Sequence, residues 1–159
     1  MSTKRLSARV SSARKVGVGQ LPGHELVFQK IGRLDGSAKC DIAPSVKENS
    51  IVIGVILELS AAQIDELDRC EGLGYGYAAK MVELKCPGVE TIAARTYYAT
   101  SVDVNLRPFH WYKNHVIVGA RENALPDSYI QSIEAVESID DPCLARAERE
   151  MAIHRERTA

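Results

Sequence analysis

The order of apolar and polar positions along this chain predicts both strands and helices. A continuous apolar run over residues 51–57, rich in β-branched side chains, is typical of a strand buried on both faces. Alternation predicts further strands over 24–29, 38–43, 77–84 and 91–99, the last two joined as a hairpin across Pro87-Gly88. Helices are predicted over 3–14, 60–72 and 108–118, and a further helix begins near Leu125-Pro126. Because strands and helices mix without regular βαβ alternation, the pattern predicts an α+β fold.

Glycine and proline interrupt this pattern before the first predicted strand. Gly17-Val18-Gly19 and Pro22-Gly23 fall there, and we expect no regular element across them. Gly54 lies inside the long apolar run, where the lack of a side chain lets another group approach the backbone closely.

Length, composition and charge are those of one globular domain. The chain has 159 residues, 45% of them hydrophobic and 26% charged, with a formal net charge of −1. This balance gives no reason to expect a nucleic-acid or membrane partner. The sequence has no apolar run of about 18 residues, and its basic N-terminus has no apolar signal core. We therefore expect a cytoplasmic protein.

The C-terminal segment is more highly charged than the rest of the chain. We divide the sequence into a domain over residues 1–137 and a charged C-terminal helix or tail over 138–159. This segment is either solvated, or it docks on a second subunit of a homodimer through Leu144, Ala147 and Met151.

Several common chemical signatures are missing from the sequence. The cysteines are Cys40, Cys70, Cys86 and Cys143. No two form a Cys-x-x-Cys pair, so we expect reduced, mostly buried thiols and neither disulfides nor a zinc site. His110 and His115 fall on different helix faces, and we expect them at the surface or at an interface. The chain has no dinucleotide fingerprint, phosphate-binding loop or Gly-x-Ser-x-Gly elbow, so we expect no cofactor and no metal.

Glu71 lies where an acidic residue is unexpected. Ile64 and Leu67 set the apolar face of the helix predicted over 60–72, and Glu71 continues that face because it follows them at helical spacing. Loss of solvation there would raise the pKa of its carboxyl and suit it to proton transfer near neutral pH. Alternatively, the last turn of the helix frays and Glu71 reaches water.

Other features of this helix bear on Glu71. Ser60 and Gln63 have the spacing of a capping box at the helix start. Asp68 either forms a carboxylate pair with Glu71 or pairs with a basic neighbour. Gly72-Leu73-Gly74-Tyr75-Gly76 follows the helix, and its amides either face a ligand or form a plain tight turn.

Three segments, in their order and spacing, resemble the gamma-glutamylcyclotransferase (AIG2-like) family over about residues 2–135. They are the unit from Val52-Ile53-Gly54-Val55 to Leu67-Asp68-Arg69-Cys70-Glu71-Gly72, the strand that starts at Tyr77, and Gly119-Ala120-Arg121-Glu122-Asn123-Ala124-Leu125-Pro126 followed by Tyr129. Asp35-Gly36-Ser37-Ala38-Lys39-Cys40-Asp41-Ile42 fits the family's glycine-bearing strand region. The resemblance implies an α+β fold with a small mixed, barrel-like sheet flanked by helices.

The resemblance also implies roles for particular residues. The glutamate of the family's Leu-Asp-x-x-Glu-Gly segment is the general acid/base, and it falls on Glu71. Gly72, Tyr77 and Tyr112 are implied to bind the substrate. The implied reaction is intramolecular aminolysis of a small gamma-glutamyl amide, which forms 5-oxoproline and a free amine without cofactor or metal.

One departure from the family pattern concerns the start of the chain. Family members begin with a strand that ends in Tyr-Gly-Ser-Asn, whereas Met1-Ser2-Thr3-Lys4-Arg5-Leu6 matches the helix that follows it. We therefore expect an open sheet edge and fewer backbone donors for the substrate. Three interpretations stay open: a cyclotransferase-type enzyme, an enzyme for another gamma-glutamyl conjugate, and an inactive binding or regulatory domain on the same fold.

Overall fold

Six strands and five helices make up the described part of the chain, which in this computed structural model comprises residues 2–7, 10 and 13–155. In chain order they are α1 (Thr3–Ser7), β1 (Arg14–Pro22), β2 (His24–Ile31), β3 (Ala38–Pro44), β4 (Ile51–Glu58), α2 (Ala61–Glu71), β5 (Tyr77–Cys86), β6 (Val89–Ala99), α3 (His110–Glu122), α4 (Asp127–Glu134) and α5 (Leu144–Ala152). The predicted α+β fold is confirmed, as are the hairpin and the helices that follow it.

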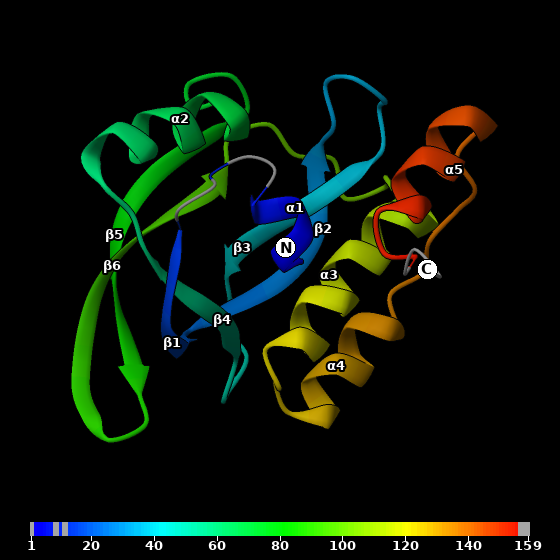
Figure 1. Cartoon of the computed structure of the whole chain (residues 1–159). Coiled ribbons are helices and arrows are strands. Elements are labelled where there is room, and N and C mark those ends of the chain that lie inside the picture. Colours follow the sequence, from blue (N-terminus) through cyan, green and yellow to red (C-terminus); the bar gives the residue numbers. More distant parts are fainter. Residues whose placement is uncertain (1, 8–9, 11–12, 156–159) are drawn as a thin grey trace.

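The strands form two antiparallel sheets. The larger has the order β4-β1-β5-β6 and the smaller pairs β2 with β3. Backbone bonds after β6 join them, because Ile31 N–H donates to Ser101 O (3.1 Å) and Asp103 N–H donates to Gln29 O (2.8 Å). The sheets do not close into a barrel within the described residues. Figure 1 shows the larger sheet on one side, α3, α4 and α5 on the other, and α1 between them.

The first strand differs from the prediction. The helix predicted over 3–14 is limited to α1, residues 8, 9, 11 and 12 lie outside the described residues, and Arg14 already belongs to β1. Gly19, which we expected to interrupt regular structure, lies inside this strand. A Cβ atom at Gly19 would lie 2.9 Å from Ile56 Cδ1, so the glycine is there because neighbouring side chains approach the backbone.

The apolar run of β4 is buried less completely than predicted. Val52 and Ile56 are buried, whereas Ile53 and Val55 are only half-buried. The expectation of a strand buried on both faces is wrong because β4 lies at the edge of an antiparallel sheet, not inside a parallel one. Gly54 adjoins open space, since a Cβ atom there would meet nothing within 4 Å.

The hydrophobic core lies between the smaller sheet and helices α3 and α4. Its buried members are Phe28, Ala38, Ile117, Ala120, Leu125, Ile130 and Ile133. Tyr129 and Val136 pack against this cluster, so α4 and the residues just after it face the core. The core fixes α3, which carries one wall of the cavity described below.

Helix α2 has the capping predicted from its sequence. Ser60 N–H donates to Gln63 Oε1 (2.9 Å), as in a capping box. The helix ends at Gly72, whose φ of 71° is left-handed, and Leu73 N–H donates to Asp68 O (2.9 Å). Glu71 is the last helical residue, so the last turn of α2 is not frayed.

Two further expectations from the sequence are wrong, one about His115 and one about the cysteines. His115 is only 2% exposed and not at the surface, because α5 packs beside α3. The four cysteines are free, but Cys70 and Cys143 are exposed, so the thiols are not mostly buried.

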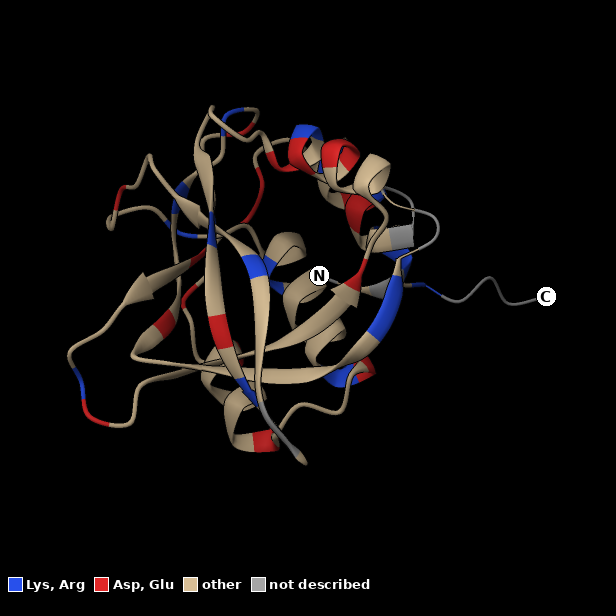
Figure 2. Cartoon of the chain, turned by 90° about the vertical axis from the view of Figure 1, so that its left-hand side faces the viewer, with Lys and Arg blue, Asp and Glu red and all other residues tan. Residues whose placement is uncertain are grey.

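Charge is spread over the molecule without segregation by sign. Acidic and basic residues alternate over the strands and helices in Figure 2, as the net charge of −1 suggests. No helix in the described ranges is both long and apolar enough to cross a membrane.

Candidate active site

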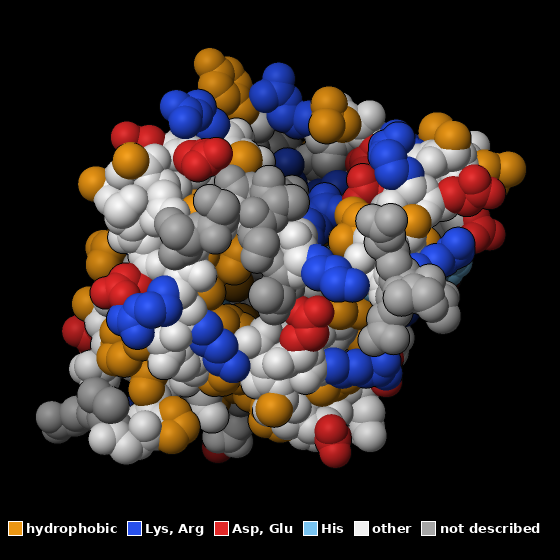
Figure 3. Space-filling model, in the orientation of Figure 1, with side chains coloured by type: hydrophobic (Ala, Val, Ile, Leu, Met, Phe, Trp, Pro, Cys, Tyr) orange, Lys and Arg blue, Asp and Glu red, His pale blue; other side chains and the backbone are white. Residues whose placement is uncertain are grey.

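A cavity of about 920 Å³ lies between the sheets and the helices. Its lining includes all four residues predicted to form the site: Glu71, Gly72, Tyr77 and Tyr112. Figure 3 shows the molecule hollowed in this region, with Lys and Arg side chains in and around the opening. The volume is within the usual range of about 300–1,000 Å³ for small-molecule sites.

Glu71 is held at the cavity wall by contacts one turn earlier in α2. Asp68 forms a two-pronged ion pair with Arg95 of β6 (2.5 and 3.0 Å), and Tyr97 Oη donates to Asp68 Oδ1 (2.5 Å). The hydrogen bond from Arg95 lowers the pKa of the Asp68 carboxyl. Asp68 therefore pairs with a basic neighbour, as one of the two interpretations expected. Glu71 itself is half-buried and lines the cavity.

The glycine-rich loop after Glu71 is a tight turn. The amide N–H groups of Gly72, Leu73, Gly74 and Tyr75 donate to the carbonyl oxygens of Arg69, Asp68, Tyr77 and Gly72 at 2.9–3.2 Å. These four amides are therefore not available to a ligand. Of the two readings of this loop, the structure favours the turn.

Tyr77 and Tyr112 both bind the backbone of Cys40 in β3. Tyr77 Oη donates to Cys40 O (2.6 Å), and Cys40 N–H donates to Tyr112 Oη (3.0 Å). Burial raises the pKa of the Tyr112 hydroxyl well above its usual value and raises the pKa of the Cys40 thiol to about 11. Tyr112 and Cys40 are thus neutral near pH 7, and the two tyrosine hydroxyls fix β3 at the cavity wall.

Lys30 is a cavity residue that the sequence reasoning missed. It is 7% exposed, and its ammonium lies 4.8 Å from the centroid of the Tyr77 ring. The register of β2 with β3 shifts between Phe28 and Lys30, and such irregularities often turn a side chain toward a site. The predicted strand ended at residue 29. The available signal for Lys30 was a lysine directly after a half-buried predicted strand. The change in the pairing register of β2 and β3, however, leaves no pattern in the sequence.

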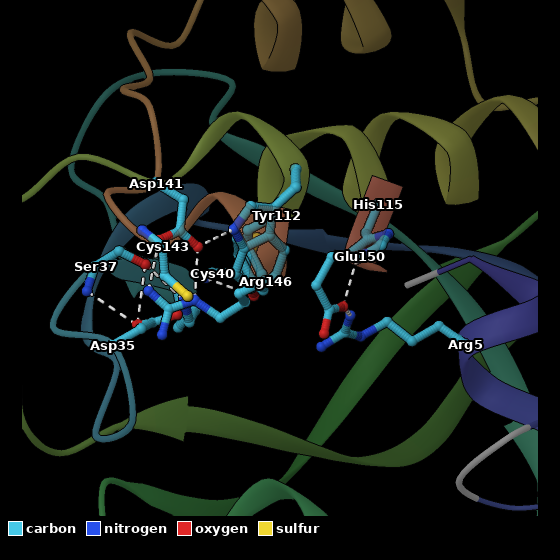
Figure 4. A network of polar contacts seen from close by, with 12 residues as sticks. Arg5, Asp35, Ser37, Cys40, Tyr112, His115, Asp141, Cys143, Arg146 and Glu150 are labelled. Carbon is cyan, nitrogen blue, oxygen red and sulfur yellow. Dashed lines mark hydrogen bonds and ion pairs between the residues drawn. The ribbon is translucent and has the colours of Figure 1, made fainter. Parts of the chain in front are cut away.

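The ammonium of a second cavity lysine, Lys39, forms its hydrogen bonds with other residues of the protein. Its ammonium donates to Asp35 Oδ2 (2.7 Å) and Ser37 Oγ (2.6 Å), and it lies over the rings of Trp111 and Tyr112 at 5.0 and 4.7 Å. Figure 4 shows Asp35 beside Ser37, with which it is hydrogen-bonded, and Arg146 nearby. Lys39 therefore helps to build the wall.

Helices α1, α3 and α5 meet through a polar cluster. Glu150 Oε2 accepts from Arg5 Nη1 (2.5 Å) and lies 3.1 Å from His115 Nε2, as Figure 4 shows. His115 Nδ1 lies 2.5 Å from His154 Nε2. Burial lowers the pKa of His115 to about 4, so its ring is neutral near pH 7.

The chemistry of the cavity is that of acids and bases. Glu71 supplies a carboxylate, Lys30 an ammonium, and Tyr77 and Tyr112 supply phenol groups. Among the residues the structure describes, no group of three His, Cys, Asp or Glu side chains could hold a metal ion. Such a set is suited to moving a proton beside a polar, charged small molecule.

Comparison with known families places this cavity in context. Residues 51–133, slightly more than half of the chain, match the model of the AIG2-like family. The chain belongs to the AIG2-like family. The matched range contains Glu71, Gly72, Tyr77 and Tyr112, whereas Lys30 lies outside it.

The curated relatives of this AIG2-like chain include two mammalian enzymes. It is 30% identical over 87 residues to the gamma-glutamylcyclotransferase of Mus musculus, which is 54% of this chain and 46% of the relative. It is also 30% identical over 90 residues to that of Homo sapiens, covering 56% of this chain and 47% of the relative. The alignments thus span about half the length of these relatives.

Solved structures show the same fold as this AIG2-like chain. A gamma-glutamyl cyclotransferase aligns with a TM-score of 0.84 at 24% identity, over 95% of this chain and 92% of the other. An uncharacterized protein from Homo sapiens aligns with a TM-score of 0.79 at 26% identity, over 87% and 83% of the two chains.

Proposed function

We propose that this protein converts a gamma-glutamyl amide to 5-oxoproline and a free amine, with Glu71 as the general acid/base. The main support is that Glu71 ends a well-capped helix at the wall of a cavity large enough for a small substrate. Similarity to proteins described as gamma-glutamylcyclotransferases supports the reaction type. The protein would therefore act as an acyltransferase whose acceptor is the substrate's own amine.

The reaction needs one proton donor and acceptor beside the substrate. The α-amine attacks the side-chain carbonyl carbon, a C–N bond closes the five-membered lactam, and the C–N bond to the leaving amine breaks. Glu71 removes a proton from the attacking nitrogen and delivers one to the leaving nitrogen. Such acid–base catalysis is worth about 10²- to 10⁴-fold in rate, and holding the two reacting ends together adds to it.

The surrounding residues hold this geometry. Asp68 and Arg95 fix the last turn of α2, and therefore the direction in which Glu71 leaves the helix. The hydroxyl groups of Tyr77 and Tyr112 hold β3 in place through the backbone of Cys40. Gly54 leaves open space beside β4, which keeps room for the substrate.

The proposal is tested by measuring 5-oxoproline release from a panel of gamma-glutamyl amides. We expect Glu71→Gln to lower kcat at least about 100-fold without lowering the melting temperature. Glu66→Gln, which changes an exposed carboxylate on the same helix, is the matched control and should be as active as the parent. Equal rates for Glu71→Gln and the parent would remove Glu71 from the mechanism. Binding of these amides by the parent without any turnover would favour a binding or regulatory domain instead.

A further inference from the structure

We propose that the ammonium of Lys30 binds the free α-carboxylate of the gamma-glutamyl group and makes the site select substrates that carry this carboxylate. The inference rests on the proposed function and adds a substrate-binding residue to it.

Lys30 is a buried cation for which the described residues supply no hydrogen-bond acceptor. Its residue is 7% exposed and lines the cavity, and its ammonium donates no hydrogen bond to any residue that the structure describes. Lys39, the other strongly buried lysine at the cavity, donates to Asp35 and Ser37. An ammonium taken out of water without a hydrogen-bond acceptor is costly, so an anionic ligand that accepts from it would relieve that cost.

The position of Lys30 is fixed by the loop that follows Glu71. A Cβ atom at Gly76 would lie 3.1 Å from Lys30 Cε and 3.4 Å from Nζ, so the glycine leaves room for the lysine. The Tyr77 ring covers the ammonium at 4.8 Å. Burial lowers the pKa of Lys30, and the negative charge of Glu71 opposes this shift.

This arrangement matches the layout of a gamma-glutamyl group. Its α-amine and α-carboxylate are attached to the same carbon, so an amine that reaches Glu71 brings the carboxylate close to that side chain. Two carboxylates at short distance repel each other, and a cation between them stabilises both. Lys30 is placed to supply this cation.

Other groups at the cavity are less suited to the role. The amides of Gly72, Leu73, Gly74 and Tyr75 donate within the chain. Three lining cations are paired with acids: Arg5 with Glu150, Lys39 with Asp35, and Arg146 with Asp141. Lys15, Arg33 and Arg149 are exposed to solvent. Among the described residues, Lys30 is therefore the buried cation that a substrate carboxylate can use.

The test compares two substrates on four proteins. The substrates are gamma-glutamyl-alanine and the same dipeptide with its glutamyl α-carboxylate converted to a carboxamide. The proteins are the parent, Lys30→Met, Lys30→Arg and the control Lys47→Met, which changes an exposed lysine outside the cavity. We expect the parent to prefer the carboxylate by about 30-fold in kcat/KM.

Lys30→Met should lose most of this preference, mainly through a higher KM for the carboxylate substrate. Lys30→Arg should keep part of it, and Lys47→Met should keep all of it. Lys30→Met should also melt no lower than the parent, because it removes a buried charge. If Lys30 served only to stabilise the fold, this variant would have a lower melting temperature than the parent. If Lys30→Met does not fold, Lys30→Gln takes its place. An unchanged preference in the neutral variant overturns the inference.

A binding measurement separates failure of this inference from failure of the proposed function. Calorimetry compares 5-oxoproline, which keeps the carboxylate, with its carboxamide on the parent and on Lys30→Met. Carboxylate-dependent binding that Lys30→Met abolishes supports the assignment even if no gamma-glutamyl amide is turned over, in which case only the proposed reaction fails. Equal binding of the two compounds by the parent overturns the role of Lys30.

Discussion

Tyr77 and Tyr112 bind the two backbone polar groups of one residue from two different elements. Tyr77 of β5 donates to the Cys40 carbonyl (2.6 Å), and Tyr112 of α3 accepts from the Cys40 amide (3.0 Å). These bonds join β3 to the larger sheet and to the helical layer. The cavity wall between Glu71 and α3 therefore depends on two hydroxyl groups.

Loss of the Tyr112 hydroxyl should destabilise the fold. Tyr112→Phe leaves the Cys40 N–H without its acceptor, and we expect the free energy of unfolding to fall by about 1–2 kcal/mol. Urea unfolding measures this change. Tyr75→Phe, which alters an exposed tyrosine of the same cavity, should change stability by less than about 0.5 kcal/mol. Similar losses in both variants would contradict the role of the Cys40 bond.

The tether of α2 should matter more for rate than for stability. Asp68→Asn removes the ion pair with Arg95 and frees the last helical turn, so we expect kcat for 5-oxoproline release to fall about 10-fold. The pair is partly exposed, so the loss in stability should stay below about 1 kcal/mol. Steady-state kinetics and thermal melts measure the two effects. Asp65→Asn, an exposed acid on the same helix, should behave like the parent.

Two glycines of β1 provide a matched test of packing. Gly19→Ala would bring a Cβ atom within 2.9 Å of Ile56 Cδ1 and 3.1 Å of Leu84 Cδ1, so we expect a loss of about 1–3 kcal/mol in unfolding free energy. Gly17→Ala meets nothing within 4 Å and should be neutral or slightly stabilising. Chemical denaturation of both variants measures the difference, and equal stabilities would contradict the close packing at Gly19.

Acidification should weaken the fold through His115. Its pKa is lowered from 6.5 to about 4 by burial, so between these values the unfolded chain binds the proton and the folded chain does not. The free energy of unfolding should therefore fall as pH decreases from about 6.5 to about 4, by up to about 3 kcal/mol. Burial lowers the pKa of His154 as well, which acts in the same direction.

Denaturation midpoints at pH 7.5, 6.5, 5.5 and 5.0 measure this dependence. His115→Gln should flatten the curve, because glutamine takes up no proton in this range. His110→Gln changes an exposed histidine and should keep the slope of the parent. A parent and a His115→Gln variant with the same slope would show that another group is responsible.

Local patterns were enough to predict much of the fold. The capping spacing of Ser60 and Gln63 and the glycine at position 72 define α2 almost to the residue, and Gly88 marks the hairpin turn with a φ of 76°. These signals lie within a few residues of the structure they determine. The placement of Glu71 at the end of α2 follows from them.

The remaining features depend on contacts between distant segments. From the sequence, Gly19 was expected to interrupt regular structure. Only the structure shows that Ile56 and Leu84 pack against it. His115 is buried by a helix some 30 residues later in the chain, and Lys30 enters the cavity where strand pairing changes register. The periodicity of a sequence shows only the helix or strand to which a residue belongs. It could not have shown the contacts that these three residues make with distant segments.

Arg5 and Glu150 are 145 positions apart, yet their ion pair forms part of the cavity wall. That part of the wall cannot assemble during translation until the ribosome has passed residue 150 and α5 has emerged. Until then the polar lining stays open to water, and a nascent chain should gain ligand affinity only at a late stage of synthesis.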